Sequence, residues 1–181
     1  MSLTKRVLGR SGIEVSTMAM GCWPIAGMTS LDVNPADSEA TLKAALDSGI
    51  TFFDTAHCYG LEGESERLIN KALGSERDRI VIATKGGIYW KPGPKQGFDA
   101  SPATLKHQCE ESLVRLGTDR VDLLYLHAPD PETPIEESAA AMAELVEEGK
   151  ALAVGVSNVS LEQLQQFHEV CPVSAIQPPY N

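Results

Sequence analysis

Polar or ionisable residues close five apolar runs along this chain. They are Asp54, Lys85, His127, the pair Ser157 and Asn158, and Gln177. Strands of a parallel sheet are buried on both faces and read as continuous apolar stretches, so polar side chains gather where such strands emerge. The pattern therefore predicts that residues far apart in the sequence meet around one cavity.

Three of these residues, together with Tyr59, form a set suited to proton transfer. Tyr59 follows Asp54 by five residues, in the loop after an apolar run. A free phenol has a pKa of about 10, so it exchanges protons poorly near neutrality unless a nearby cation stabilises the phenolate. Lys85 is a candidate for that cation, with Asp54 as its carboxylate partner. His127 completes the set as a hydrogen-bond donor to a substrate oxygen.

Strands that alternate with helices are expected to position these residues. The apolar runs predict six strands, at 16–21, 51–54, 80–85, 121–127, 151–157 and 174–177. Amphipathic segments predict five helices, near 37–48, 64–73, 102–116 and 134–148 and after residue 160. Turn residues at 9–12 predict a β-hairpin within residues 4–15. The glycine- and proline-rich segment 89–97 is expected to be a solvated loop.

Capping residues and glycines mark the helix ends. The first four helices are followed by Gly49, Gly74, Gly117 and Gly149. Glycine adopts the left-handed conformation that commonly ends a helix, so all four are expected to adopt it. Thr133 is expected to cap the fourth helix, with Pro134 at its first position and Glu136 closing a capping box. Ser160 and Gln163 predict a second capping box.

The alternation of strands and helices predicts right-handed βαβ units in a parallel sheet. A doubly wound nucleotide-binding fold would carry a glycine-rich motif after its first strand, and residues 18–23 hold none. Chemistry at several strand ends is typical of the (β/α)8 TIM barrel, which usually needs about 250 residues. The chain has 181 residues. We therefore expect one incomplete α/β barrel domain over 1–181, with an N-terminal hairpin, six strands and five helices.

Taken together, the motifs resemble the aldo-keto reductase family. They are D-T-A-x-x-Y-G at 54–60, A-T-K at 83–85, D-L-L-Y-L-H at 122–127, G-V-S-N at 155–158 and Q-P-P-Y-N at 177–181. The segments L-G-R-S-G-I-E-V-S and E-G-x-S-E-R-L-I are similar to the bacterial branch related to potassium-channel β subunits. Several spaced motifs in one order are more specific than any single motif, and the match runs along nearly the whole chain.

The resemblance implies an oxidoreductase that reduces aldehydes or ketones with NADPH. Tyr59 would protonate the carbonyl oxygen while Lys85 and Asp54 tune its acidity, and His127 would orient the carbonyl. The residues implied in binding NADPH or NADP+ are Gly21, Asp54, Ser157, Asn158 and Gln177. Three aromatic residues, Trp23, Tyr89 and Trp90, are candidates either for lining the substrate pocket or for anchoring loops.

Other readings follow from the length of the chain and from His57. In the family the last two βα units carry much of the adenosine pyrophosphate site, and the sequence ends before them. We therefore expect a truncated or partial chain, or one that needs a complementary segment, with weak NADPH binding and little activity alone. A nucleotide-binding regulatory subunit and an inactive truncated barrel remain open. A metal hydrolase using Asp54, His57 and His127 is disfavoured, because His57 lies in a loop without a matching ligand set.

The composition of the chain argues against nucleic acid and membranes as binding partners. The formal charge is −10, from 15 basic and 25 acidic residues, which argues against nucleic acid and provides no polybasic membrane patch. No apolar run approaches the ~18 residues of a membrane span, and the first residues lack the apolar core of a signal peptide. A cytoplasmic protein with a small carbonyl substrate is expected, and homo-oligomer formation stays open. Its four unevenly spaced cysteines predict reduced thiols.

Overall fold

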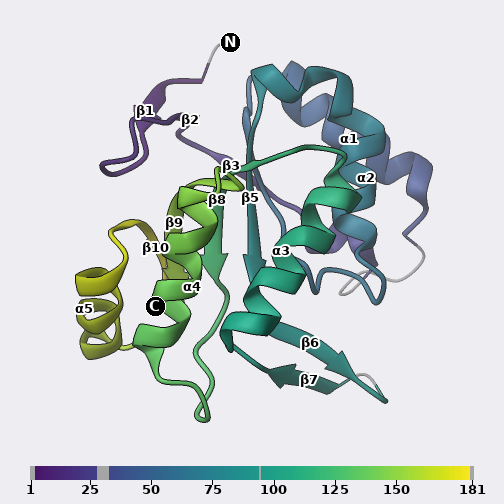
Figure 1. The fold of residues 1–181 in the computed structure, drawn as a ribbon. Helices are drawn as coiled ribbons and strands as arrows, with labels where there is room; N and C mark the ends of the chain where they lie inside the picture. Colours follow the sequence, from purple (N-terminus) through teal and green to yellow (C-terminus); the bar gives the residue numbers. More distant parts are fainter. Residues whose placement is uncertain (1–2, 28–32, 94, 180–181) are drawn as a thin grey trace.

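The computed structural model describes residues 3–27, 33–93 and 95–179. Its centre is a six-stranded sheet in the order β10-β9-β8-β5-β4-β3, in which all neighbours are parallel (Figure 1). The strands are β3 (Ala19–Gly21), β4 (Phe52–Asp54), β5 (Val81–Gly86), β8 (Val121–Leu126), β9 (Ala151–Ser157) and β10 (Val173–Gln177). The parallel alternation predicted from the sequence is confirmed.

Five α-helices cover the outer face of this sheet, each packed against the next along the chain (Figure 1). They are α1 (Pro35–Asp47), α2 (Glu64–Leu73), α3 (Pro102–Leu116), α4 (Ile135–Glu147) and α5 (Leu161–Val170). Two short 3-10 helices, η1 (Pro24–Ala26) and η2 (Gly74–Arg79), complete the helical elements of the described residues. A curled parallel sheet with helices outside it is the architecture of an incomplete (β/α)8 barrel, as expected.

Two antiparallel hairpins flank the sheet. The first pairs β1 (Lys5–Val7) with β2 (Glu14–Ser16) and confirms the predicted N-terminal hairpin. The second pairs β6 (Ile88–Lys91) with β7 (Lys95–Phe98), where a solvated loop had been expected. Gly97 lies opposite Tyr89, and a Cβ at Gly97 would be 2.4 Å from the tyrosine ring. That glycine therefore allows a close strand pairing and does not mark a loop.

The first predicted strand, 16–21, is wrong in its extent. Ser16 ends β2, and the sheet strand β3 contains only Ala19–Gly21. The Ser16 hydroxyl donates to the carbonyl of Met18 at 2.6 Å and accepts from the amide of Thr51 at 3.0 Å. These contacts turn the chain between the hairpin and the sheet. The first helix also begins earlier than expected, because Asn34 caps it through the amide of Asp37.

The helix caps agree with the sequence at most positions. Gly49, Gly117 and Gly149 have left-handed φ values of 92°, 64° and 75°. The prediction for Gly74 is wrong: its φ is −57°, because the chain continues directly into η2.

One of the two predicted capping boxes is present. The box of Ser160 and Gln163 at the start of α5 is confirmed. The expected box of Thr133 and Glu136 is not formed, since α4 is preceded by Pro134 without a side-chain cap. The carboxylate of Asp130 instead accepts from the Thr133 amide at 3.0 Å. A side chain from the preceding loop therefore holds the segment that the box would have organised.

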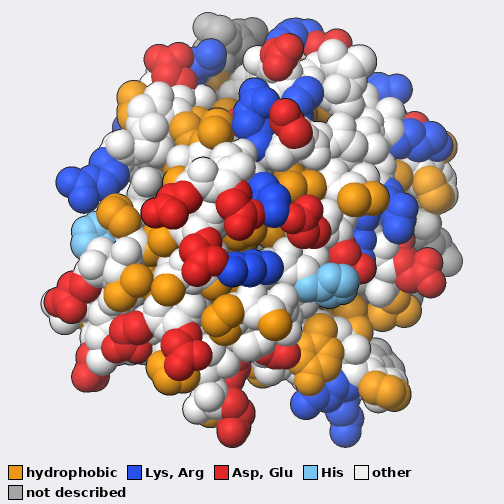
Figure 2. Space-filling view, viewed as in Figure 1, with side chains coloured by type: hydrophobic (Ala, Val, Ile, Leu, Met, Phe, Trp, Pro, Cys, Tyr) orange, Lys and Arg blue, Asp and Glu red, His pale blue; other side chains and the backbone are white. Residues whose placement is uncertain are grey.

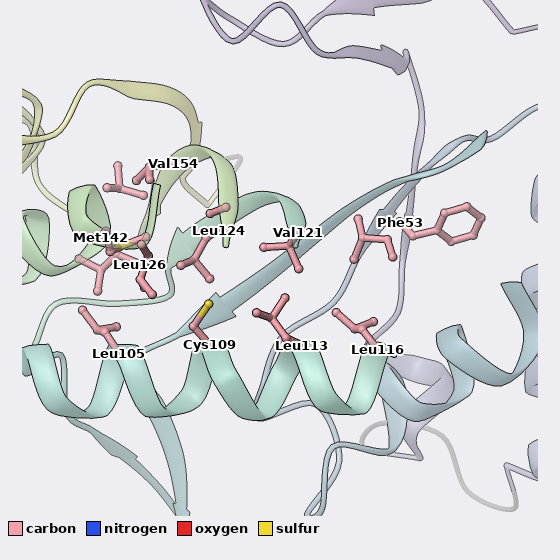
Figure 3. Close-up of a cluster of buried hydrophobic side chains, with 14 of the residues drawn as sticks. Phe53, Leu105, Cys109, Leu113, Leu116, Val121, Leu124, Leu126, Met142 and Val154 are labelled. Atoms are coloured by element: carbon pink, nitrogen blue, oxygen red, sulfur yellow. The ribbon is translucent and has the colours of Figure 1, made fainter. Parts of the chain in front are cut away.

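The core lies between the sheet and its helices. Figure 3 shows Leu105, Cys109, Leu113 and Leu116 along one face of α3, pointing toward side chains of the sheet. The spacing of these four residues matches the helical period, so α3 buries one continuous stripe. All four cysteines of the chain are free and buried, in line with the predicted reduced thiols.

The outer surface of the helices mixes charges of both signs. In Figure 2 acidic and basic side chains lie together over α3, whereas the charged side chains of α4 are all acidic. Ion pairs such as Lys106 with Glu144 and Lys150 with Glu110 join neighbouring elements there. In the parts of the chain that the structure describes, no helix is both long enough and apolar enough to cross a lipid bilayer.

Candidate active site

Strand register brings the predicted residues to one end of the sheet. Gly21 on β3 lies beside Asp54 on β4, and Ser157 on β9 lies beside Gln177 on β10. Lys85, near the end of β5, pairs with Tyr125 on β8, and His127 directly follows that strand. The carboxyl ends of parallel strands share one edge, so the prediction that these residues meet there is confirmed.

Lys85 lies at the centre of the site with three hydrogen bonds. Its side chain is 1% exposed. The Nζ atom donates to Asp54 Oδ1 at 2.9 Å, to the Thr55 carbonyl at 2.7 Å and to Tyr59 Oη at 3.3 Å. An ammonium has three N–H donors, so every one of them has a partner here. A buried charge that is paired and fully hydrogen-bonded in this way can remain ionised.

Tyr59 holds its proton firmly in this environment. Burial, and next the negative charge of Asp54, raise the pKa of Tyr59 well above its usual value. This direction is opposite to the one expected from Lys85 alone, because desolvation penalises the phenolate more than the lysine stabilises it. Near neutral pH the phenol is therefore protonated, which is the form that can donate a proton.

His127 is a neutral imidazole beside Tyr59. The two ring centroids are 5.8 Å apart in an edge-to-face arrangement. Burial, and next the positive charge of Lys85, lower the pKa of His127 to about 3. Its Nδ1 atom is 3.6 Å from the sulfur of Cys58. Its backbone is also fixed, since the amide donates to the Gly86 carbonyl at 2.8 Å.

Ser157, Asn158 and Gln177 form a connected polar group on the other side of the site. The Ser157 hydroxyl donates to the Gln177 carbonyl at 2.9 Å. Asn158 has the left-handed φ of 57°, and its Nδ2 donates to the His127 carbonyl at 2.9 Å. The Gln177 Nε2 donates to Asp54 Oδ2 at 3.4 Å. This last contact joins the two predicted groups, so all the polar strand ends belong to one arrangement.

An open cleft of about 560 Å³ lies over these residues. It is lined by Trp23, Tyr59, Ile88, Gln96, Phe98, His127, Ala128, Pro129 and Asn158. Most of these side chains are apolar, and the polar ones come from the strand ends and the hairpin. Sequence reasoning missed Gln96 and Phe98, because they belong to the unexpected β6–β7 hairpin.

The three candidate aromatic residues have different surroundings. Trp23 lines the cleft and packs edge-to-face on Tyr59, with ring centroids 4.9 Å apart. Trp90 points elsewhere: its Nε1 donates to the carbonyls of Cys58 at 2.8 Å and Gly60 at 3.1 Å. Tyr89 is exposed beside Lys91 and is not part of the cleft wall. Trp90 is therefore a loop anchor, which was one of its two expected roles.

A buried ion pair missed by sequence reasoning lies behind the loop of Tyr59. Glu66 on α2 is 0% exposed and lies 3.4 Å from Nη1 of Arg115 on α3. Arg115 also donates to the His57 carbonyl at 3.1 Å, and Glu66 accepts from the Thr84 hydroxyl at 2.6 Å. The pair thus connects the Tyr59 loop with the strand of Lys85. No local motif could reveal it, because the two residues lie 49 positions apart.

The metal alternative finds no support. His57 Nε2 lies 2.7 Å from Glu111 Oε2 on α3 and is thereby tied to a helix. Within residues 3–27, 33–93 and 95–179, no group of three or more potential ligands is arranged to hold a metal ion.

Comparison with known proteins identifies consistent relatives. A family model described as the aldo/keto reductase family matches residues 17–181. The aldo-keto reductase YhdN of Bacillus subtilis (strain 168) is 45% identical over 174 residues, which cover 94% of this chain and 52% of the relative. The L-glyceraldehyde 3-phosphate reductase of Escherichia coli (strain K12) is 37% identical over 187 residues, which cover 97% of this chain and 53% of the relative. The chain thus spans about half the length of these curated relatives.

Solved structures give the same picture. The glycerol dehydrogenase AKR11B4 from Gluconobacter oxydans matches with a TM-score of 0.87 and 40% identity, over 98% of this chain and 55% of that chain. The aldo-keto reductase AKR11C1 from Bacillus halodurans matches with a TM-score of 0.87 and 31% identity, over 98% of this chain and 58% of that chain.

Proposed function

The chain belongs to the aldo/keto reductase family, and we propose that the protein carrying it reduces aldehydes or ketones to alcohols, with NADPH as cofactor. The observation that carries the proposal is the single set of contacts made by Lys85, which joins Asp54 and Tyr59 through one ammonium. The names of two relatives support the proposal: one is an L-glyceraldehyde 3-phosphate reductase and the other a glycerol dehydrogenase. The cytoplasmic location stays a prediction.

Tyr59 is the proton donor of this proposal. Tyr59 lines the cleft, and because burial raises its pKa the proton stays on the phenol at neutral pH. As the proton leaves, negative charge develops on Oη, and the charge-assisted hydrogen bond from the Lys85 ammonium strengthens. Catalysis depends on such interactions that strengthen in the transition state. Lys85 therefore acts on the departure of the proton and not on the resting acidity of Tyr59.

Asp54 keeps Lys85 charged and in place. Without the contact of 2.9 Å to Asp54, a lysine this deeply buried would lie in an environment that disfavours its ammonium form. His127 presents a neutral ring to the cleft beside Tyr59 and orients the carbonyl oxygen by a hydrogen bond. The substrate carbonyl oxygen then lies between Tyr59, which donates the proton, and His127, which donates a hydrogen bond.

The polar strand ends fit a nicotinamide ribose. Asn158 uses its Nδ2 for the carbonyl of His127, and its side-chain oxygen has no hydrogen-bond partner within the described residues. That oxygen is an acceptor for a carboxamide N–H, while Ser157 and Gln177 provide further polar groups and Asp54 accepts from a hydroxyl. A Cβ at Gly21 would meet nothing within 4 Å, so room remains at the end of β3. NADPH, when bound here, supplies the hydride.

The cleft favours a small carbonyl compound with an apolar part. Trp23, Ile88 and Phe98 provide apolar wall, and Gln96 provides a polar group. Sites that bind small molecules commonly combine apolar walls with a few polar groups that set orientation.

The substitution Tyr59→Phe in the complete protein tests the proposal. Carbonyl reduction should fall by about 10²-fold to 10⁴-fold, the usual contribution of general acid catalysis, while NADPH still binds. Turnover of small aldehydes at the wild-type rate would refute the role of Tyr59. An unsubstituted protein that binds NADPH but reduces no carbonyl compound would instead favour the regulatory subunit that the sequence left open.

A further inference from the structure

Cys58 is a buried residue that the proposed mechanism does not use. It lies between His57 and Tyr59, is 2% exposed, and packs in a small cluster with Ala56, Ile88 and Ala128. Its sulfur is 3.6 Å from Nδ1 of His127, a distance within the range of hydrogen bonds to sulfur. In the described part of the chain, Sγ has no hydrogen bond to any other group.

The protonation states of the two groups leave one hydrogen to share. Burial raises the pKa of the Cys58 thiol to about 12, so the sulfur keeps its hydrogen near neutral pH. His127 is neutral, so one of its ring nitrogens is bare. Either the thiol donates to a bare Nδ1, or an Nδ1–H donates to the sulfur. A bare imidazole nitrogen is a good acceptor and a thiol sulfur a weak one, so the first arrangement is favoured.

We propose that Cys58 sets the tautomer of His127 by donating its S–H to Nδ1, which keeps the ring proton on Nε2. With Nδ1 occupied, Nε2 is the nitrogen left for the cleft, and in this tautomer it is a hydrogen-bond donor. The opposite tautomer would present a bare nitrogen, which repels a carbonyl oxygen. Cys58 is thus a positioning residue, and its catalytic consequence rests on the proposed function, while the tautomer itself does not.

Other groups around the ring do not make this choice. Tyr59 meets the imidazole edge-to-face, and Asn158 bonds to the backbone carbonyl of His127 and not to the ring. Lys85 is the charged group that affects the ring, and its charge disfavours the doubly protonated form. It therefore supports a neutral ring without assigning the remaining proton. A hydrogen bond on one ring nitrogen is the usual determinant of the state of the other.

Nitrogen-15 NMR of the histidine side chains tests the proposal in the complete protein. The chain contains four histidines, and loss of one set of signals in His127→Gln identifies those of His127. In the wild type at neutral pH, the Nε2–H form should be the major tautomer. In Cys58→Ala, the ratio of Nε2–H to Nδ1–H should fall by about threefold to tenfold, the effect of losing one modest hydrogen bond. Cys58→Ser retains a donor and should stay close to the wild type.

Cys109→Ala is the matched control, because Cys109 is equally buried on α3 but packs in the main core. It should leave the His127 signals unchanged. A predominant Nδ1–H form in the wild type would overturn the proposal, and so would an unchanged ratio in Cys58→Ala. The wild-type spectrum alone decides the first point, so the proposal stays testable even where a variant folds poorly.

Activity measurements separate this proposal from the proposed function. If Cys58→Ala shifts the tautomer and lowers kcat for carbonyl reduction while the Kd of NADPH is unchanged, both are supported. If the tautomer shifts but kcat does not change, the role of Cys58 stands and the role of His127 in catalysis is refuted.

Discussion

Gln177 on β10 and Asp54 on β4 lie 3.4 Å apart, through Nε2 and Oδ2, although β9, β8 and β5 separate their strands in the sheet. A flat sheet would hold these side chains about four strand spacings apart, or roughly 19 Å. The contact therefore measures how strongly the sheet curls. It also gives the Asp54 carboxylate two separate partners, with Lys85 on Oδ1 and Gln177 on Oδ2.

Replacing one partner of the Asp54 and Lys85 ion pair should destabilise the fold more than replacing both partners. Asp54→Asn leaves a fully buried ammonium without its counter-charge, and we expect the free energy of unfolding to fall by about 3–5 kcal/mol. The double variant Asp54→Asn with Lys85→Met should be less destabilised than Asp54→Asn alone. Urea unfolding of the wild type, Asp54→Asn and the double variant measures the difference. Glu14→Gln, which breaks an exposed pair with Lys5, should cost no more than about 1 kcal/mol.

Arg115 should affect both stability and turnover. Arg115→Met leaves Glu66 buried without its cation and frees the His57 carbonyl, so we expect a loss of about 3–5 kcal/mol in unfolding free energy and a lower kcat. Arg115→Lys should recover part of both. Urea unfolding and steady-state kinetics provide the two measurements.

Arg77 offers a control of similar burial for Arg115. It pairs with Asp122 at 2.9 Å and donates to two carbonyls, but near the amino ends of the strands. Arg77→Met should lose comparable stability and keep its kcat. Equal losses of kcat in the Arg115→Met and Arg77→Met variants would show that Arg115 contributes only general stability.

Trp90 and Trp23 should differ in what their substitution changes. Trp90→Phe removes the N–H that holds the carbonyls of Cys58 and Gly60, so amide hydrogen exchange should accelerate around residues 58–61 and kcat should fall. Trp23→Phe alters a wall of the cleft, so it should change KM for the carbonyl substrate. It should leave amide hydrogen exchange around residues 58–61 close to that of the wild type. A Trp90→Phe protein with wild-type exchange would contradict the anchoring role.

Acidification should destabilise the protein through His127. Burial and Lys85 set its pKa at about 3, whereas the unperturbed value is 6.5. Between these values the unfolded chain binds a proton that the folded chain does not, so stability present above about pH 6.5 is lost as pH falls toward 3. The slope contributed by His127 is at most about 1.4 kcal/mol per pH unit.

Unfolding free energies between about pH 4 and 7 measure this slope. His127→Gln should reduce it, while His107→Gln, at an exposed position on α3, should not. His57, whose pKa is also lowered by burial, is present in both variants and cancels in the comparison. An identical slope in His127→Gln would mean that the folded protein accommodates the imidazolium.

The sequence predicted the positions of the strand ends better than the chemistry of Tyr59. Buried parallel strands leave long apolar runs, so the places where Asp54 and Lys85 emerge are visible without coordinates. The pKa of Tyr59 is raised first by burial and next by the charge of Asp54, and only the three-dimensional arrangement gives the direction of this shift. The spacing of residues could suggest the cation but not the extent of burial.

Local signals failed where other parts of the chain supplied the same interaction. The capping pattern at Thr133 was overridden because Asp130 already holds that amide, whereas the same pattern at Ser160 had no competitor and formed. The hairpin β6–β7 was hidden because its glycine serves a strand pairing with Tyr89. The pair of Glu66 and Arg115 joins two helices, and no short window of sequence contains both residues.

Gly63 lies against the ion pair of Glu66 and Arg115, so the three positions constrain one another. Gly63 has a left-handed φ of 77°, which favours glycine, and a Cβ there would lie 2.6 Å from atoms of the Arg115 side chain, so a larger residue at 63 would displace Arg115. A shorter residue at 115 would leave the buried carboxylate of Glu66 without its cation. The three positions are therefore expected to co-vary among natural sequences, because residues in direct contact constrain one another's replacement. Replacement at any one of them should therefore be accompanied by changes at the other two.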